Sequence, residues 1–341
     1  MKPSVLLSGA AWSALNAAVA VLFPLALFVL FARLVPPWQI GLVAVALASL
    51  EILKALCPQG LYETLVAAEP TRERERSAAA VLLASAAAAT VAFAAGVGVA
   101  AALSETVAEV WPWLAALGLK ILFDVATLQP QATLARRAAF RLLALRSVGA
   151  NLLAGAVGAA LAWKVHPLTG MAAYPVLQSA LLFLFTVAGA GALAVPRFER
   201  GALSGLRREA GFASAVRIVA ALNTYLDQIL IAAFVPARAV AGFNLGKRIE
   251  TALATTGSTF SNVLFQPMFA SRPASERPRL LRAGRGLLTA LCGAPVVVFV
   301  VLAEPLVGVV FGERWLWAAL AAALLAVSGL ARLYGTLYGA L

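Results

Sequence analysis

Residues 207–250 read RREAGFASAVRIVAALNTYLDQILIAAFVPARAVAGFNLGKRIE, and this stretch decides the fold. It predicts two long apolar helices joined by a tight turn at Val235-Pro236-Ala237. A charged side chain within an apolar helix is costly in a lipid bilayer, so each one is a candidate functional residue. The two helices carry five of them: Arg217, Asp227, Lys247, Arg248 and Glu250.

The composition predicts an all-α polytopic membrane protein. Of the 341 residues 62% are hydrophobic and only 12% are charged, and the mean hydropathy is +0.91. Apolar runs long enough to span a membrane recur along the whole chain. The net charge of +12 would suggest nucleic acid in a soluble protein. Here most of the Lys and Arg residues lie in short loops, where they set membrane topology.

Histidine and cysteine are too few for most catalytic or metal chemistry. The chain has one histidine, His166, which nearly excludes a catalytic or zinc site built on imidazole. Cys57 and Cys292 both lie in apolar runs, and we interpret them as small buried residues. We therefore expect no enzyme activity, no catalytic residue, no metal site and no cofactor. Coupling of the protein to a proton or to Na⁺ stays open.

The apolar runs predict ten membrane-spanning helices. The first run is too long for a cleaved signal peptide and is interpreted as a retained helix. Their approximate ranges are 5–33, 39–66, 77–102, 108–134, a fifth helix ending near 163, 169–195, a seventh ending near 235, an eighth from 239, 283–308 and 315–341.

The longest linker divides these helices into two bundles. We expect an N-terminal six-helix bundle in residues 1–195, a cytoplasmic linker in 196–208 and a C-terminal bundle in 209–341. The second bundle then has four helices and is partial.

The loop charges predict the orientation. With the N-terminus inside, the inner segments hold sixteen Lys and Arg residues and the outer turns hold four. This asymmetry in short loops predicts a multi-pass membrane protein with its N-terminus in the cytoplasm. The Arg- and Glu-rich segment 69–76 is most simply a solvated turn.

The second half of the sequence echoes the first. The turn Val35-Pro36-Pro37 corresponds to Val235-Pro236-Ala237, and Trp111-Pro112-Trp113 corresponds to Trp315-Leu316-Trp317. The offsets are 200 and 204 residues. Six helices separate the copies, so the repeats run parallel, about an axis along the membrane normal. Such a protein has its substrate site at the interface between the repeats.

The charges at membrane depth predict both ion pairs and an anion site. The seven cations are Lys54, Lys120, Arg146, Arg217, Lys247, Arg248 and Arg332, and the four acids are Glu51, Asp124, Asp227 and Glu250. Their helical spacing predicts the pairs Glu51–Lys54 and Lys120–Asp124. Asp227 lies at the same depth as Lys247 and Arg248, which predicts a salt bridge across the hairpin.

Three arginines, Arg146, Arg217 and Arg332, have no acid nearby in the sequence. Arg146 and Arg217 are close enough to the inner face to snorkel. We favour the alternative in which at least one of the three faces a cavity that attracts an anion. The planar guanidinium suits phosphate, with which it makes paired hydrogen bonds. The seven cations are thus candidates for a cationic lumen, and the four acids are candidates for coupling or for structural pairs.

Several segments resemble the polysaccharide biosynthesis flippases of the multidrug/oligosaccharidyl-lipid/polysaccharide (MOP) exporter superfamily, a MATE-like group. The resemblance is closest to the O-antigen and exopolysaccharide type, and it covers most of the chain. The segments that carry it are Phe31–Pro36, Ile40–Ala44, Asn223–Ile231, Ala241–Ile249, Val263–Met268 and Ala303–Trp315.

The resemblance implies a two-bundle fold, alternating access and export of an undecaprenyl-pyrophosphate-linked oligosaccharide. It also implies a polysaccharide polymerase and glycosyltransferases of the same pathway as partners, besides membrane lipid and the substrate. The family usually has more helices than the ten predicted here. Two alternatives stay open: a MATE-like multidrug or organic-cation antiporter, and a truncated, non-transporting membrane partner.

Overall fold

The computed structural model is built of helices throughout the part of the chain that it describes, as the sequence predicts. It describes residue 19 and residues 21–67, 71–191, 194–265, 268–269, 273 and 275–338. The first part of the predicted helix 5–33 lies outside these residues. The chain divides into two compact units, and we describe each by itself. Unit 2 is Leu42–Pro236, and unit 1 combines Met1–Gly41 with Ala237–Leu341.

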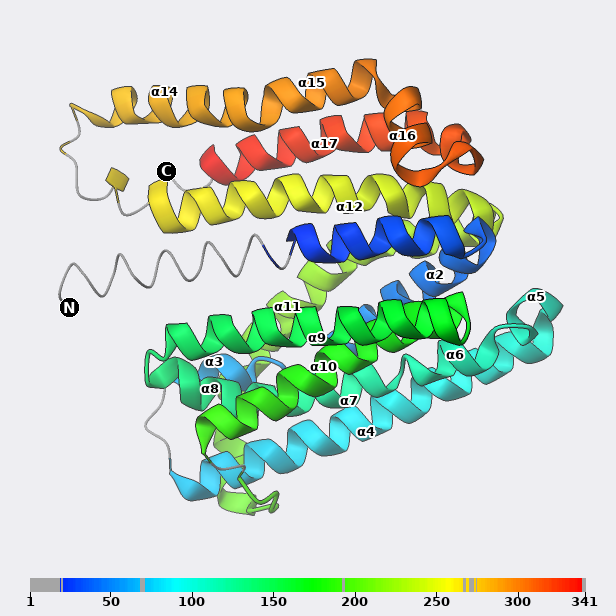
Figure 1. Cartoon of the computed structure of the whole chain (residues 1–341). Helices are drawn as coiled ribbons and strands as arrows, with labels where there is room; N and C mark the ends of the chain where they lie inside the picture. The colour runs from blue at the N-terminus through cyan, green and yellow to red at the C-terminus, as the bar shows by residue number, and fades with distance from the viewer. Residues whose placement is uncertain are drawn as a thin grey trace. The chain divides into compact units, whose positions relative to one another are not determined.

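Unit 2 contains most of α2 and all of α3 to α11 (Figure 1). The longest of these helices, α4 and α11, pack against each other, and α9 pairs with α10 along its length. The bounds are α2 (Pro37–Ala55), α3 (Leu61–Ala67), α4 (Arg72–Leu103), α5 (Glu105–Ala108), α6 (Trp111–Ala116), α7 (Leu119–Ala126), α8 (Leu128–Arg136), α9 (Phe140–Lys164), α10 (Pro167–Ala190) and α11 (Arg200–Phe234).

The α9–α10 hairpin shows how local sequence fixes a turn. His166 is extended and caps α10, since its Nδ1 accepts a hydrogen bond from the Leu168 amide at 3.3 Å. Pro167 follows at the first helical position, where its missing N–H costs nothing. Beyond the turn Gly158 and Gly170 meet, and a Cβ on Gly170 would lie 2.2 Å from the Gly158 carbonyl oxygen. Small residues at this crossing therefore let the two backbones touch.

The predicted single helix 39–66 is wrong, because the chain breaks after α2 and restarts as α3. Pro58 lacks an amide hydrogen and cannot continue α2. Gly60 then passes close to α11, where its amide donates to Ser214 Oγ at 3.0 Å. A Cβ at Gly60 would lie 2.3 Å from the Ala210 carbonyl oxygen, so the close approach requires glycine.

Unit 1 contains the apolar helix Val21–Leu34 and the helices from α12 onward. α12 and α17 lie side by side along their lengths (Figure 1). The bounds are α12 (Ala237–Thr259), η1 (Phe260–Phe265), α14 (Arg277–Leu288), η2 (Thr289–Gly293), α15 (Ala294–Val301), α16 (Ala303–Phe311), η3 (Glu313–Ala318) and α17 (Ala319–Tyr338).

Glycines bring α12 and α17 together. A Cβ on Gly242 would lie 2.6 Å from the Trp317 ring, and one on Gly246 would lie 3.0 Å from the Ala321 carbonyl oxygen. From the other side, a Cβ on Gly329 would lie 2.8 Å from Glu250 Cα. Gly242 and Gly246 are four residues apart on one face of α12, which is the spacing typical of close helix pairs in membranes.

A buried tryptophan ties the start of unit 1 to its end. Trp315 is fully buried, and its Nε1–H donates to the Ala32 carbonyl oxygen at 2.9 Å. Its ring stands edge-on to Phe28, with centroids 6.3 Å apart. Arg33 Nε donates to the Val310 carbonyl oxygen at 2.9 Å. The helix Val21–Leu34 is therefore held against the residues around 310–315, which are far from it in the sequence.

Eight helices in the described residues are long and apolar enough to cross a membrane. They correspond to eight of the ten predicted spans, and they make this a multi-pass membrane protein. The other two predicted spans correspond to Val21–Leu34, of which only a shorter part is described, and to α12. With 23 residues α12 is long enough to span, but Arg238, Lys247, Arg248 and Glu250 make it too polar for a span defined by hydropathy. α11 begins at Arg200, inside the predicted linker 196–208, and the two-bundle division of the chain stays a prediction.

The close contact of α12 with α17 predicts a size limit at Gly246. We expect Gly246→Leu to lower the free energy of unfolding by about 1–3 kcal/mol, because the side chain must push α17 away. Thermal denaturation of the purified protein measures this loss. Gly286→Leu is the control, since a Cβ at Gly286 meets nothing within 4 Å. Equal melting temperatures for the two variants would contradict the close packing.

Candidate functional site

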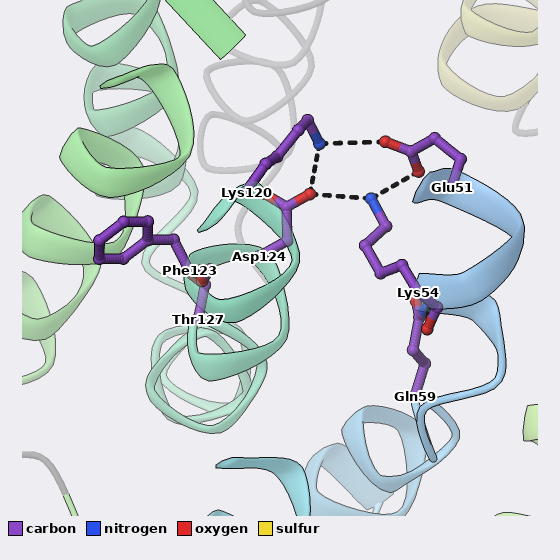
Figure 2. A network of polar contacts seen from close by, with 7 residues as sticks. All are labelled: Glu51, Lys54, Gln59, Lys120, Phe123, Asp124 and Thr127. Atoms are coloured by element: carbon purple, nitrogen blue, oxygen red, sulfur yellow. Dashed lines mark hydrogen bonds and ion pairs between the residues drawn. The ribbon is translucent and has the colours of Figure 1, made fainter. Parts of the chain in front are cut away.

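Four charged side chains form a closed ring in unit 2 (Figure 2). Lys54 Nζ lies 2.5 Å from Glu51 Oε2 and 2.8 Å from Asp124 Oδ2. Lys120 Nζ lies 3.0 Å from Glu51 Oε1 and also bonds Asp124. Each lysine therefore bridges both acids, and these contacts join α2 to α7.

The ring is electrically neutral and only partly accessible. Its side chains are 14–20% exposed. An unpaired charge costs at least ~2.5–3.5 kcal/mol at the centre of a bilayer, and mutual pairing removes most of this cost. The ring thus lowers the free-energy cost of having four ionised side chains in the membrane-spanning part of unit 2.

The sequence predicts the pairs Glu51–Lys54 and Lys120–Asp124 from helical spacing, and both ion pairs are present in the structure, which confirms the prediction. The two contacts that join one pair to the other, Lys54–Asp124 and Lys120–Glu51, link residues about 70 positions apart. No local pattern in the sequence predicts them. The signal that could have predicted these two contacts is the presence of opposite charges at equal depth in different helices.

The expectation that Arg217 lacks an acidic partner is wrong. Its Nε donates to Glu63 Oε1 at 3.1 Å, and Nη2 bonds the same oxygen. Glu63 lies on α3, the short helix that exists because the chain breaks at Pro58. The Arg217 side chain is 36% exposed and that of Glu63 is 45% exposed, so the pair lies at an accessible edge of unit 2.

Arg146 has no acidic partner among the described residues, as the sequence predicts. It lies on α9 and donates from Nη1 to Thr186 Oγ1 on α10. Its Nε is buried and has no hydrogen-bond partner among the described residues. Within that part of the chain no acid pairs with it. It is a cation at membrane depth that the α9–α10 hairpin only partly satisfies.

In unit 1 the charges gather around Glu250, whose side chain is only 4% exposed. Arg332 Nη1 on α17 lies 2.9 Å from Glu250 Oε1, and Lys247 Nζ lies 3.3 Å from Oε2. The expectation that Arg332 lacks an acidic partner is therefore wrong. The close α12–α17 packing brings together two residues that are 82 positions apart.

Arg248 is oriented by an aromatic ring and an amide. Its guanidinium carbon lies 4.2 Å from the centroid of Phe28, and its Nε donates to Asn244 Oδ1 at 3.2 Å. A cation held over a ring face is fixed in direction while it keeps its charge. The planar guanidinium of an arginine is suited to a bidentate anionic partner.

Asp227 accepts a hydrogen bond from the amide of Gln228 at 2.7 Å. Its predicted salt bridge with Lys247 or Arg248 would join the two compact units and stays a prediction.

Metal ligands do not cluster. No group of three or more His, Cys, Asp or Glu residues could hold a metal ion in the part of the chain that the structure describes. Cys57 and Cys292 are buried free thiols, one in each unit.

Comparison with known proteins assigns the family. The family model described as "Polysaccharide biosynthesis protein" matches residues 30–320. The chain belongs to this family. The match contains the ring in unit 2 and the Glu250 partner Lys247, while Arg332 lies beyond it. No curated protein matches this chain in sequence.

Solved structures show similar helical chains at low identity. A eukaryotic MATE transporter, AtDTX14, is 14% identical, with a TM-score of 0.48 over 99% of this chain and 84% of that chain. The lipid II flippase MurJ in an inward closed conformation is 12% identical, with a TM-score of 0.47 over 94% and 86%. An inward-facing multidrug resistance MATE family transporter of the MOP superfamily is 14% identical, with a TM-score of 0.49 over 100% and 86%. Likeness at this level carries no information on the substrate.

The charge balance of this polysaccharide biosynthesis protein differs between its units. Among the described residues, the candidates in unit 2 are four cations and three acids, and Glu63 adds a fourth acid. In α12 and α17 of unit 1, Lys247, Arg248 and Arg332 face one acid, Glu250. The surplus of positive charge is therefore in unit 1, and the ring lysines of unit 2 are already compensated.

An apolar groove of about 520 Å³ lies in unit 2, on the face of α2 opposite to Glu51 and Lys54. Ser49 and Leu53 of α2 line one side of it, and Gly96 of α4 and Leu114 of α6 line the other. A hollow with these walls suits an aliphatic chain.

The closed ring predicts strong coupling between its members. We expect Asp124→Asn to lower the free energy of unfolding by on the order of 3 kcal/mol, because it leaves an excess lysine charge. The double variant Asp124→Asn/Lys120→Gln should regain most of this, since it retains the neutral Glu51–Lys54 pair. Thermal denaturation of the purified variants measures both. Glu63→Gln, at the exposed pair with Arg217, should cost less than about 1 kcal/mol. A double variant less stable than Asp124→Asn would disprove the coupling.

Proposed function

We propose that this protein flips an undecaprenyl-pyrophosphate-linked oligosaccharide across the bacterial inner membrane by alternating access, for export of O-antigen or exopolysaccharide. The observation that carries the proposal is the positive surplus around Glu250 in a member of the polysaccharide biosynthesis family. The N-terminus would lie in the cytoplasm, in keeping with the loop charges.

The chemistry of such a substrate fits this surplus. A pyrophosphate diester carries about two negative charges, and its oxygens accept hydrogen bonds in pairs. The three candidate cations on α12 and α17, Lys247, Arg248 and Arg332, exceed the single acid Glu250 by two charges. Bringing the diester to this place would neutralise the excess, which supports an anionic rather than a neutral or cationic ligand.

The three cations have separate roles in this proposal. Arg248, which Phe28 holds in direction, would meet the pyrophosphate through its guanidinium. Arg332 is 42% exposed and Lys247 is 12% exposed, so Arg332 is the more accessible member of the Glu250 cluster. Arg146 is a further cation for the same lumen. Lys54, Lys120 and Arg217 would contribute only where their ion pairs open.

Pairing of the acids argues against the multidrug alternative. An organic cation needs an acid that is free to bind it, whereas Glu51, Asp124 and Glu250 are all held by lysine or arginine.

The non-transporting partner is the second alternative, and a direct flipping assay separates it from the proposal. Coupling to a proton or to Na⁺ would use Asp227 or Asp124. The proposed partners are a polysaccharide polymerase and glycosyltransferases, and the protein acts as a transporter rather than an enzyme.

Arg248 is the residue whose charge tests the proposal. In proteoliposomes that contain a fluorescent pyrophosphate-linked oligosaccharide lipid, we expect Arg248→Gln to slow flipping at least about tenfold, since it removes a charge-assisted contact. Arg285→Gln is the control, because it removes one charge from an exposed position on α14. Chemical reduction of the fluorophore in the outer leaflet measures the rate. Flipping at the wild-type rate in Arg248→Gln, or no flipping by the wild type, would contradict the proposal.

The apolar groove supplies a second test, on the lipid part of the substrate. A Cβ at Gly96 meets nothing within 4 Å, so Gly96→Leu can fill the groove without strain. If the polyprenyl chain lies there, we expect this variant to flip the lipid several-fold more slowly at unchanged stability. Gly98→Leu on the same helix is equally open but does not line the groove. Equal flipping rates in the two variants would place the chain elsewhere.

A further inference from the structure

A basic cavity of about 700 Å³ lies at one end of unit 2. Its walls come from the start of α4, the end of α8 and the residues at and after the end of α10. Three membrane-length helices meet there: one span begins at Arg72, one ends at Arg136 and one ends at Ala190. The cavity therefore lies at the level of a membrane surface. The loop charges predict that this surface is the cytoplasmic one.

Four arginines and one acid line the cavity: Arg72, Arg76, Arg136, Arg137 and Glu75. Two of the arginines are fixed by the protein. Arg136 bonds Glu75 and donates from Nη1 to the Leu65 carbonyl oxygen at 2.6 Å. Arg137 Nη1 donates to the Ala190 carbonyl oxygen at 3.1 Å, at the negative end of α10. These contacts hold the walls in place.

The other two arginines have no such partner. The side chains of Arg72 and Arg76 make no ion pair or hydrogen bond with any residue that the structure describes. Glu75, the acid of the cavity, is bonded to Arg136. The cavity therefore carries an excess of positive charge. The side chains of Arg72 and Arg76 can bind a ligand without first breaking an ion pair.

A buried amide faces the same cavity. Gln129 is only 4% exposed, and its Oε1 has no hydrogen-bond partner among the described residues. The NH₂ group of the same amide is a donor for an anion in the cavity. Thr133, one turn further along α8, adds a hydroxyl to the lining. A set of arginines that only marked topology would be dispersed in solvent and would need no such buried donor.

We propose that this cavity binds a phosphate group, with Arg72 and Arg76 as its contacts and Gln129 as the donor at its base. Basic pockets between spanning helices on the cytoplasmic side suit the headgroups of anionic lipids. A soluble phosphate compound carries the same chemistry. The site lies in unit 2, apart from the cations of α12 and α17, and does not rest on the proposed transport function.

The test measures ligand-induced stabilisation of the full-length purified protein in detergent. Three additions are compared: inorganic pyrophosphate, dioleoyl-phosphatidylglycerol in mixed micelles, and dioleoyl-phosphatidylcholine in mixed micelles. We expect at least one of the two anions to raise the melting temperature and the zwitterionic lipid to leave it unchanged. Stabilisation by phosphatidylglycerol alone assigns the site to a lipid headgroup. Stabilisation by pyrophosphate assigns it to a soluble ligand.

Charge-removing variants locate the effect. Arg72→Gln/Arg76→Gln should weaken the apparent affinity about a hundredfold, at about tenfold for each charge-assisted contact. Arg74→Gln removes a charge from the same turn of α4 but does not line the cavity, so it should retain the affinity within about threefold. The single variant Arg76→Gln, with a tenfold loss, replaces the double variant if that one does not fold.

Three results would overturn the proposal: no stabilisation of the wild type by either anion, full affinity in the Arg72/Arg76 variants, or an equal loss in Arg74→Gln. Arg285→Gln should bind the anion normally, because it removes an exposed charge on α14, outside the cavity. A loss of binding confined to the Arg72 and Arg76 variants therefore concerns the cavity and not the transport proposal.

Discussion

Ionised side chains at membrane depth must be neutralised, and the rest of this structure depends on how that is done. In unit 2 the ring joins Glu51 on α2 to Lys120 on α7. In unit 1 a bridge joins Glu250 on α12 to Arg332 on α17. Each unit thus uses an acid on an early helix to hold a cation on a later one. Helix pairs without a hydrophobic force between them in lipid need such contacts, along with close packing.

The two bridges agree with the repeat in the sequence. Glu51 follows Val35 by sixteen residues, and Glu250 follows Val235 by fifteen, so the acids occupy nearly the same place after corresponding turns. The cations differ: Lys120 follows Trp111 by nine residues and Arg332 follows Trp315 by seventeen, about two helical turns further along. The bridges are therefore similar in plan but differ in depth. This supports duplication followed by divergence of the charged positions.

The sequence predicted what depends on local spacing and missed what depends on helix breaks and packing. Helical character, most spans and the pairs Glu51–Lys54 and Lys120–Asp124 follow from periodicity and from i, i+3 or i, i+4 neighbours. The Arg217–Glu63 pair was missed because Pro58 and Gly60 break a run that reads as one helix. The Arg332–Glu250 pair was missed because it requires the glycine contacts of α12 with α17. The prediction of a solvated turn at 69–76 is wrong from Arg72 onward, because α4 begins there and lines a cavity together with α8 and the end of α10.

The difference in charge between the units bears on what a transporter of this kind can do. In the neutral ring each charge contacts two charges of opposite sign, so drawing a lysine away from its two acids costs free energy. At Glu250 two cations, Lys247 and Arg332, contact a single acid. An anionic ligand therefore stabilises the cluster but would have to break the ring to reach its lysines. On this physical ground we place the proposed substrate contacts first at Arg248 and Arg332, and only then at Lys54 and Lys120.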